Sequence, residues 1–239
     1  ISDKDWSFGE NGLPKIGIGD WNDGFSNIGP KGKGESVWLG FFLYEVLKEF
    51  ILIAEYRNDS ETVEQYKQIA EQLRKNLNTN AWDGRWFKRA FADNEDVYGS
   101  MENEECRIDS IAQSWSVISG AGDEEKQKQA MESLENHLID IESGIIKLLD
   151  PPFEKGNLEP GYIKAYVPGV RENGGQYTHS AIWAIIAEAI LGKGDKAVEL
   201  YKMITPIEHA RTKEATNKYK VEPYVISADV YGAQNLAGS

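Results

Sequence analysis

The sequence is poor in cysteine, histidine and positive charge. A single cysteine in 239 residues excludes an intrachain disulfide framework and a cysteine-rich zinc site, and three histidines without metal-ligand spacing predict no metal site. The 26 basic residues are outnumbered by 39 acidic ones, and the net charge of −13 argues against nucleic acid or an anionic membrane surface as a partner. No apolar run approaches the roughly 20 residues that span a bilayer, and no signal-peptide pattern is visible.

What is present is an ordinary globular composition with strong helical patterning. A hydrophobic content of 41% argues against bulk disorder. Apolar residues at three-and-four spacing predict helices over residues 35–57, 60–79, 109–119, 123–141, 181–191, 195–204 and 221–231, with one short strand over 15–20. Helices that are apolar nearly all round, such as 181–191 with Glu188 as its one charged residue, alternate with amphipathic ones. This alternation predicts an all-α fold of two concentric helical layers, with irregular loops and few short strands.

The loop over residues 19–24 carries the first candidate site. Its sequence places Asp20, Trp21, Asn22 and Asp23 side by side, shortly before the first predicted helix. An indole stacks on the apolar face of a sugar ring, carboxylate and amide groups bind hydroxyls, and one carboxylic acid can protonate a glycosidic oxygen. The same run is also a strong turn sequence without any further role. A calcium loop starting at Asp20 fails, because glycine and glutamate are missing from its sixth and twelfth positions.

A second candidate site lies in the long Pro- and Gly-rich stretch before residue 181. Arg171, Glu172, Gln176 and His179 bring cationic, anionic and amide groups into a loop that leads into an apolar helix. Helix N-termini attract anions, and Arg171 and His179 would add cationic donors. The alternatives are a surface ion pair for Arg171 and a buried structural histidine for His179.

The segment 104–115 is the third candidate. Gln113 and Trp115 are placed to reach an inner cavity, whereas Asp109 or Ser110 as a helix N-cap explains part of the pattern without any function.

Together these segments resemble glycoside hydrolase family 94, the inverting disaccharide and oligosaccharide phosphorylases. The motifs that carry the resemblance are residues 19–24, 32–40, 106–115, 160–179 and 219–231. The residues in these motifs are most similar to those of β-1,2-oligoglucan phosphorylases and of the C-terminal region of cyclic β-1,2-glucan synthases. The resemblance implies that residues 1–239 form the later part of an (α/α)6 barrel, a partial catalytic domain truncated at both ends.

The resemblance also implies roles for individual residues. Asp23 would be the general acid, and inorganic phosphate would be a co-substrate that attacks in place of a second carboxylate, with no other cofactor. His179 and Arg171 would hold phosphate. The β-glucan oligosaccharide would be bound by Asp20, Trp21, Asn22, Glu172, Gln176 and Gln113.

Two departures from the family pattern lead to further expectations. A phosphate-binding arginine and a Thr/Ser-Gly phosphate loop of the family fall outside the chain, so the isolated chain is expected to be weakly active or inactive.

The intact enzyme is expected to be a cytoplasmic homodimer without direct membrane contact, or to act on the cytoplasmic face of the inner membrane if the chain trims glucan within a cyclic glucan synthase. A non-catalytic helical sugar-binding module is the alternative from another class.

Overall fold

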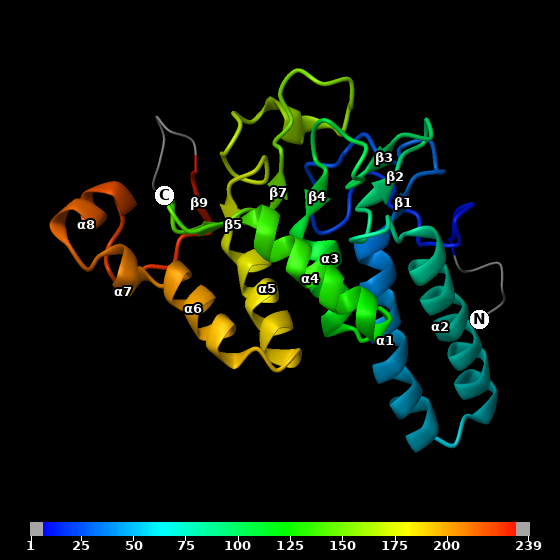
Figure 1. The fold of residues 1–239 in the computed structure, drawn as a ribbon. Coiled ribbons are helices and arrows are strands. Elements are labelled where there is room, and N and C mark those ends of the chain that lie inside the picture. The colour runs from blue at the N-terminus through cyan, green and yellow to red at the C-terminus, as the bar shows by residue number, and fades with distance from the viewer. Residues whose placement is uncertain (1–6, 233–239) are drawn as a thin grey trace.

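Helices pair along the sequence into three hairpins in the computed structural model, which describes residues 7–232 (Figure 1). The helices within this range are α1 (Val37–Tyr56), α2 (Ser60–Asn80), α3 (Ser110–Ile118), α4 (Glu124–Leu138), α5 (Thr178–Ile190), α6 (Gly194–Ile204), α7 (Pro206–His209) and α8 (Lys213–Tyr219). The strands are two residues long: β1 (Glu35–Ser36), β2 (Ala90–Phe91), β3 (Val97–Tyr98), β4 (Ile108–Asp109), β5 (Ile139–Asp140), β6 (Ile145–Ile146), β7 (Leu149–Asp150), β8 (Gln176–Tyr177) and β9 (Asp229–Val230).

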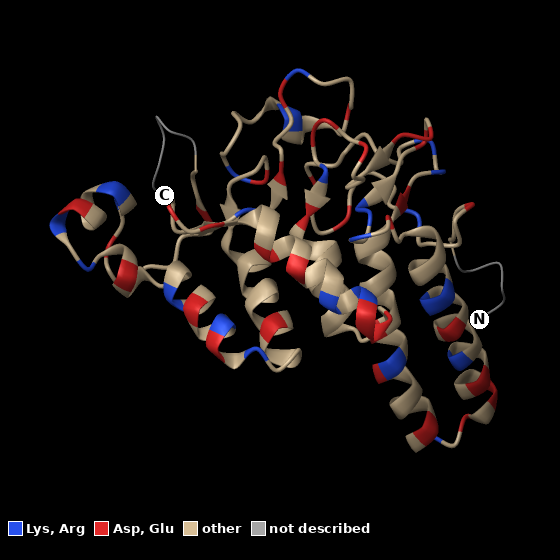
Figure 2. Cartoon of the chain, in the orientation of Figure 1, with Lys and Arg blue, Asp and Glu red and all other residues tan. Residues whose placement is uncertain are grey.

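The helices form two layers, as the alternation of apolar and amphipathic helices predicts. The helices α1, α3 and α5 lie in one row, in which α3 contacts both neighbours, and α2, α4 and α6 each pack on the outer side of one of them. The inner helices are mostly uncharged, whereas charge is spread along α2 and α6 (Figure 2). Burying the apolar stripe of each outer helix on an inner one removes apolar surface from water and drives this pairing. The all-α fold predicted from the sequence is confirmed.

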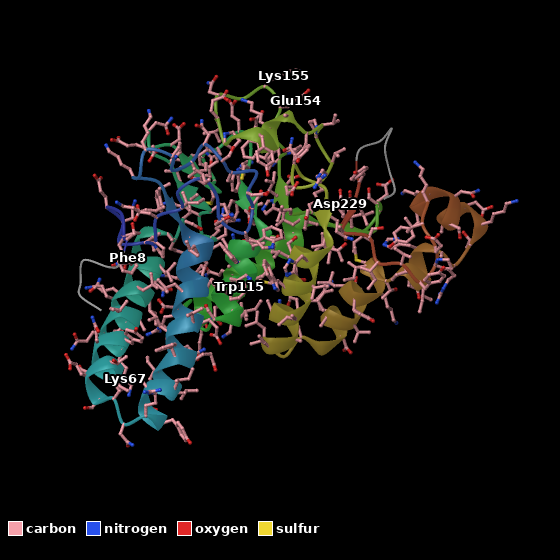
Figure 3. All side chains as sticks on the ribbon, turned by 180° about the vertical axis from the view of Figure 1, so that it is seen from behind. Phe8, Lys67, Trp115, Glu154, Lys155 and Asp229 are labelled. Atoms are coloured by element: carbon pink, nitrogen blue, oxygen red, sulfur yellow. The ribbon has the colours of Figure 1, made fainter. Side chains whose placement is uncertain are left out.

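The N-terminal ends of the three inner helices lie at one end of the array. Each inner helix directly follows a two-residue strand, namely β1, β4 or β8. The strands pair antiparallel as β1-β2-β3, β4-β7, β5-β6 and β8-β9, with Gln176 opposite Val230 in the last pair. The long loops therefore gather above these helix ends, where Figure 1 shows them at the top of the molecule. Figure 3 labels Glu154 and Lys155 at the tip of this loop region and Trp115 among the inner helices below it.

Carboxylates hold the loops of this acidic chain in place. Glu35 accepts from the backbone N–H groups of Asn11 and Leu13. Asp93 accepts from three N–H groups of residues 31–34, and Glu105 accepts from those of residues 154–156 at 2.6–2.8 Å. Backbone amides that would otherwise remain unpaired are satisfied in this way, so the loops are ordered without regular secondary structure.

Four sequence predictions are corrected by the structure. The helix predicted to Ile141 ends at Leu138, where β5 begins. Residues 15–20 form no strand beyond one bridge at Lys15. No helix covers 221–231, because Pro223 interrupts it and the β-favouring residues near its end pair as β9 with β8. The short polar helices α7 and α8 appear instead before this segment.

The fourth correction concerns α5, whose nearly all-round apolar sequence predicts burial on most sides. Its isoleucines Ile182, Ile186 and Ile190 are 39%, 41% and 56% exposed, whereas its one charged residue, Glu188, is fully buried. The isoleucines recur every four residues and therefore share one face. A similar apolar face on α1 is exposed at Phe42 and Val46. Within residues 7–232, no helix is both long and apolar enough to cross a membrane.

Candidate active site at the N-terminal end of the inner helices

The loop over residues 19–24 is held from below by a buried ion pair. Arg89 donates to both carboxylate oxygens of Asp20, each at 2.7 Å, and both side chains are inaccessible to solvent. The Ser36 hydroxyl, which caps α1, donates to the same carboxylate at 2.6 Å. The paired geometry is the one in which a guanidinium binds a carboxylate best. Asp20 is thereby fixed beneath the loop and does not point out of it.

Trp21 and His179 bring the first two candidate segments together. The Trp21 indole N–H donates to Nδ1 of His179 at 3.1 Å, although the residues lie 158 positions apart. The Trp21 ring also meets Tyr177 and Trp183 edge-on or tilted, with ring centroids 5.3 Å apart in both cases. His179 is exposed and Trp21 is half-buried. The two loops therefore open at the same end of the helical array.

Asp23 is exposed at the mouth of this loop region, next to a tyrosine. A hydrogen bond to the Asp23 carboxylate, assisted by partial burial and the negative charge of Asp23, raises the pKa of Tyr162. A tyrosine hydroxyl that donates to a carboxylate stabilises the ionised carboxylate. Asp23 thus combines access to solvent with a hydrogen-bond donor at its carboxyl group.

The loop that bears Tyr162 packs directly on the Asp23 loop. The N–H of Ile163 donates to the carbonyl of Gly24 at 3.1 Å, and the N–H of Asn27 donates to the carbonyl of Pro160 at the same distance. Gly161 has a φ of 120°, and a Cβ on it would approach Ser26 N to 2.6 Å, so only glycine fits there. The two loops are therefore fixed to each other by backbone contacts.

Arg171 and Glu172 lie close enough to Tyr177, the ring that contacts Trp21, for their charges to act on its hydroxyl group. Glu172 is 6% exposed, and its Oε2 has no hydrogen-bond partner among the described residues, although Arg171 Nε lies 3.6 Å away. The Arg171 guanidinium lies over the Tyr166 ring at 5.2 Å. A buried carboxylate oxygen without a donor is costly and suits a hydroxyl group of a ligand.

Two predicted sugar-binding residues, Asp20 and Gln113, form hydrogen bonds within the protein, and sugar binding by them stays a prediction. Both oxygens of Asp20 are used by Arg89 and its neighbours, as described above. Gln113 is fully buried, and its amide group is used on the backbone of Phe87 and Asp109 at 2.8–2.9 Å. Gln113 therefore joins α3 to the segment before β2 and does not reach a cavity.

Asn22 and Gln176 are buried but keep one polar group each for another partner. Asn22 Oδ1 accepts from Gly24 N, and Gln176 Oε1 accepts from Ile146 N. The amide nitrogens of both side chains have no partner among the described residues. Sugar binding by these two nitrogens stays a prediction.

Arg89 and Tyr162 were missed by the sequence analysis. Arg89 lies in a segment without helical periodicity, although an arginine placed between Phe87 and Phe91 signals burial with a carboxylate partner. Tyr162 lies in the long Pro- and Gly-rich stretch, with no motif around it that indicates a role. Its position beside Asp23 depends on the contact between two distant loops, which no local pattern encodes.

Comparison with known proteins agrees with these observations. The family model described as "Glycosyl hydrolase 94 superfamily, catalytic domain" matches residues 3–238. The chain is 47% identical over 230 residues to cyclic β-(1,2)-glucan synthase NdvB of Rhizobium meliloti, which covers 96% of this chain and 8% of that protein. It is 33% identical over 228 residues to solabiose phosphorylase of Paenibacillus borealis, and the match covers 95% of this chain and 29% of that protein. It is 31% identical over 218 residues to N,N'-diacetylchitobiose phosphorylase of Vibrio proteolyticus, and the match covers 90% of this chain and 26% of that protein. The chain thus spans less than a third of each of these relatives.

Proposed function

The chain belongs to the glycosyl hydrolase 94 superfamily, and we propose that it supplies the general acid and part of the sugar and phosphate sites for inverting phosphorolysis of a β-linked gluco-oligosaccharide. The observation that carries this proposal is the meeting of the Asp23 loop and the His179 loop through the Trp21–His179 hydrogen bond. An acid, an aromatic ring and an imidazole N–H donor thereby lie within one site. β-1,2-linked glucan is the proposed substrate class, in line with the 47% identity to a cyclic β-(1,2)-glucan synthase.

Asp23 is the proposed general acid. A phosphate oxygen attacks the anomeric carbon from the α face while the β-glycosidic bond breaks, and Asp23 gives its carboxylic proton to the departing oxygen. The shortened glucan leaves as an alcohol, Asp23 is left as a carboxylate, and the product is α-glucose 1-phosphate. One protein carboxyl group suffices, because phosphate takes the place of the base-activated water of an inverting hydrolase. Tyr162 is positioned to donate to the Asp23 carboxylate that results.

His179 and Arg171 are the proposed phosphate ligands of this chain. Because Nδ1 of His179 accepts from Trp21, the proton of the neutral ring lies on Nε2. His179 is exposed in the first turn of α5, where backbone N–H groups and the helix dipole favour an anion. Arg171 is half-exposed and contributes a second donor. Glu172, Asn22 and Gln176 are proposed to bind sugar hydroxyls through the unpartnered atoms described above.

The chain is much shorter than its phosphorylase relatives, which affects the activity expected of the isolated chain. The chain spans 29% of one phosphorylase relative and 26% of another, and apolar faces of α1 and α5 are exposed. We therefore propose that further helices of a parent protein cover these faces, completing an (α/α)6 barrel and the phosphate site. The isolated chain is then weakly active or inactive.

The chain-trimming domain of a membrane-bound cyclic glucan synthase is the second candidate function. It is favoured by one observation, since identity is 47% to the synthase and 33% to the solabiose phosphorylase. The same acid and phosphate sites would serve both functions. The length of the parent protein, and the presence of membrane-spanning helices in it, separates the two candidates.

The test is to incubate the intact parent with β-1,2-gluco-oligosaccharides, with and without phosphate, and to follow products by phosphorus and proton NMR. The proposal expects α-glucose 1-phosphate only when phosphate is present. Free glucose released without phosphate would identify a hydrolase, and binding without turnover would identify a non-catalytic sugar-binding module; either result overturns the proposal.

A further inference from the structure

A fully buried arginine joins the acid loop to two inner helices. Arg89 forms the bidentate pair with Asp20 described above, and its Nε lies 3.3 Å from Oδ2 of Asp109. Its guanidinium also lies over the Phe25 ring at 4.8 Å. All three charged side chains are inaccessible to solvent. Burying charged groups is costly, and hydrophobic replacements are often as stable, so the presence of this cluster calls for a reason besides stability.

Both carboxylate partners connect the cluster to a helix N-terminus. Asp109 is the N-cap of α3, and its Oδ1 accepts from Ile111 N at 2.9 Å. Asp20 accepts a hydrogen bond from the Ser36 hydroxyl. The same hydroxyl caps α1 by accepting from Leu39 N at 2.9 Å. The position of Asp20 is therefore set relative to the ends of α1 and α3 together.

A second series of hydrogen bonds runs from Asp20 along the acid loop. Asp20 Oδ1 accepts from Asn22 N at 3.0 Å, and Asn22 Oδ1 accepts from Gly24 N at 3.1 Å. The backbone on both sides of Asp23 is thus fixed by two consecutive side-chain turns. The Asp23 side chain itself is free to point outward.

We infer that Arg89 and Asp20 are positioning residues that hold the Asp23 carboxyl group at the glycosidic oxygen. This inference rests on the proposed function of Asp23 as the general acid. Proton transfer needs hydrogen-bond contact, and a displacement of about 1 Å is enough to cost roughly 10²-fold in rate. The cluster fixes the loop to the helices whose neighbour, α5, carries His179. The acid and the phosphate ligand are thereby held in one frame.

The leaving group distinguishes positioning of an acid from a general structural role. An aryl β-glucoside with a strongly acidic phenol, such as the 2,4-dinitrophenyl derivative, departs with little help from a proton, whereas a sugar alcohol needs it. The experiment compares phosphorolysis of this aryl glucoside and of a β-1,2-linked glucobiose by the intact parent and by its Asp20→Asn variant. We expect kcat on the disaccharide to fall by about 10²-fold and kcat on the aryl glucoside to fall by less than about threefold.

Three further variants complete the test. Asp93→Asn weakens the neighbouring loop 31–34 without touching Asp20, and is expected to leave the ratio of the two kcat values unchanged. Ser36→Ala removes one hydrogen bond to Asp20 and the side-chain cap of α1 while keeping the ion pair, and decides the question if Asp20→Asn does not fold. Asp23→Asn is the reference for loss of the acid.

Selective loss on the disaccharide in Asp20→Asn or Ser36→Ala supports the inference. If the variant that folds loses kcat equally on the disaccharide and the aryl glucoside, or loses it on neither, the inference is overturned. If Asp23→Asn itself shows no selective loss, the proposed function fails instead, so the two failures are told apart.

Discussion

The indole N–H of Trp21 donates to Nδ1 of His179 across 3.1 Å, linking a loop near the start of the described chain to the first turn of α5. The bond does two things for the proposed reaction. It leaves the proton of the neutral imidazole on Nε2, where it can face an anion, and it orients the Trp21 ring against Tyr177 and Trp183. The sugar-stacking residue and the proposed phosphate ligand are therefore coupled to each other.

Trp21→Phe tests this coupling, because it keeps an aromatic ring but removes the indole N–H. In the intact parent we expect the KM for phosphate to rise by about threefold to tenfold, as one neutral hydrogen bond contributes roughly 1 kcal/mol. Steady-state kinetics at varied phosphate measures it. Trp115→Phe is the matched control, since the Trp115 indole nitrogen has no hydrogen-bond partner among the described residues. A phosphate KM that is the same in both variants would remove Trp21 from the phosphate site.

Gln113→Ala tests the structural role that the hydrogen bonds of this residue indicate. The change leaves the N–H and C=O of Phe87 without partners in a buried place, and we expect the free energy of unfolding to fall by about 2–4 kcal/mol. Urea denaturation followed by circular dichroism gives this value, and the exposed Gln129→Ala should change it by less than about 0.5 kcal/mol. In the intact parent, a higher KM for oligosaccharide at unchanged stability would instead restore Gln113 to a sugar site.

The sequence predicted the long helices and the loop of Asp23 because both depend on local pattern. Three-and-four spacing specifies an apolar stripe wherever it occurs, and the run around Asp23 is short enough to be recognised directly. The pairing of Arg89 with Asp20 was not predictable in the same way. Its partners lie 69 positions apart, and the aromatic neighbours of Arg89 indicate burial but do not identify the carboxylate.

The sequence of helix α5 likewise did not predict which of its faces is buried. Its composition indicated burial, but composition does not say which face is covered. Glu188 is buried because it points toward Lys193 and Glu135, with Lys193 Nζ 3.3 Å from the Glu188 carboxylate and 2.6 Å from that of Glu135. The isoleucines of the same helix lie on a face that no helix within residues 7–232 covers. Only the arrangement of neighbouring helices decides between the two faces.

Glu188 predicts a specific dependence of stability on pH. Burial, with a further contribution from the charge of Glu135, raises the pKa of Glu188 to about 7. A carboxyl group with a raised pKa in the folded state loses stability as the pH rises from its unfolded-state pKa, near 4.3, to the folded-state value. We expect Glu188 to lower the free energy of unfolding by at most about 3 kcal/mol between pH 5 and pH 8.

Glu188→Gln should remove this component. Thermal denaturation of the chain at pH values from 5 to 8 measures it, with the exposed Glu199→Gln on α6 as the control that keeps the dependence. A decline in stability as steep in Glu188→Gln as in the unmodified chain would show that another group is responsible.

The isolated 239-residue chain is expected to release no α-glucose 1-phosphate from β-1,2-gluco-oligosaccharides at neutral pH. Phosphate must be desolvated and aligned by several donors before it attacks, and this chain offers His179 and Arg171 as the proposed ones. Weak sugar binding through Trp21 is expected to remain, which calorimetric titration detects. Phosphorolysis by the chain at a rate near that of the parent would show that the phosphate site is misplaced.

The most direct test of the account is phosphorolysis of a natural β-1,2-gluco-oligosaccharide by the intact parent and by its Asp23→Asn variant, measured as α-glucose 1-phosphate in a coupled assay. Asparagine preserves the size of the side chain but has no proton to give, so the account predicts a loss of about 10²–10⁴-fold with unchanged thermal stability. A folded Asp23→Asn variant that retains near-full phosphorolysis of this substrate would contradict the assignment of Asp23 as the general acid.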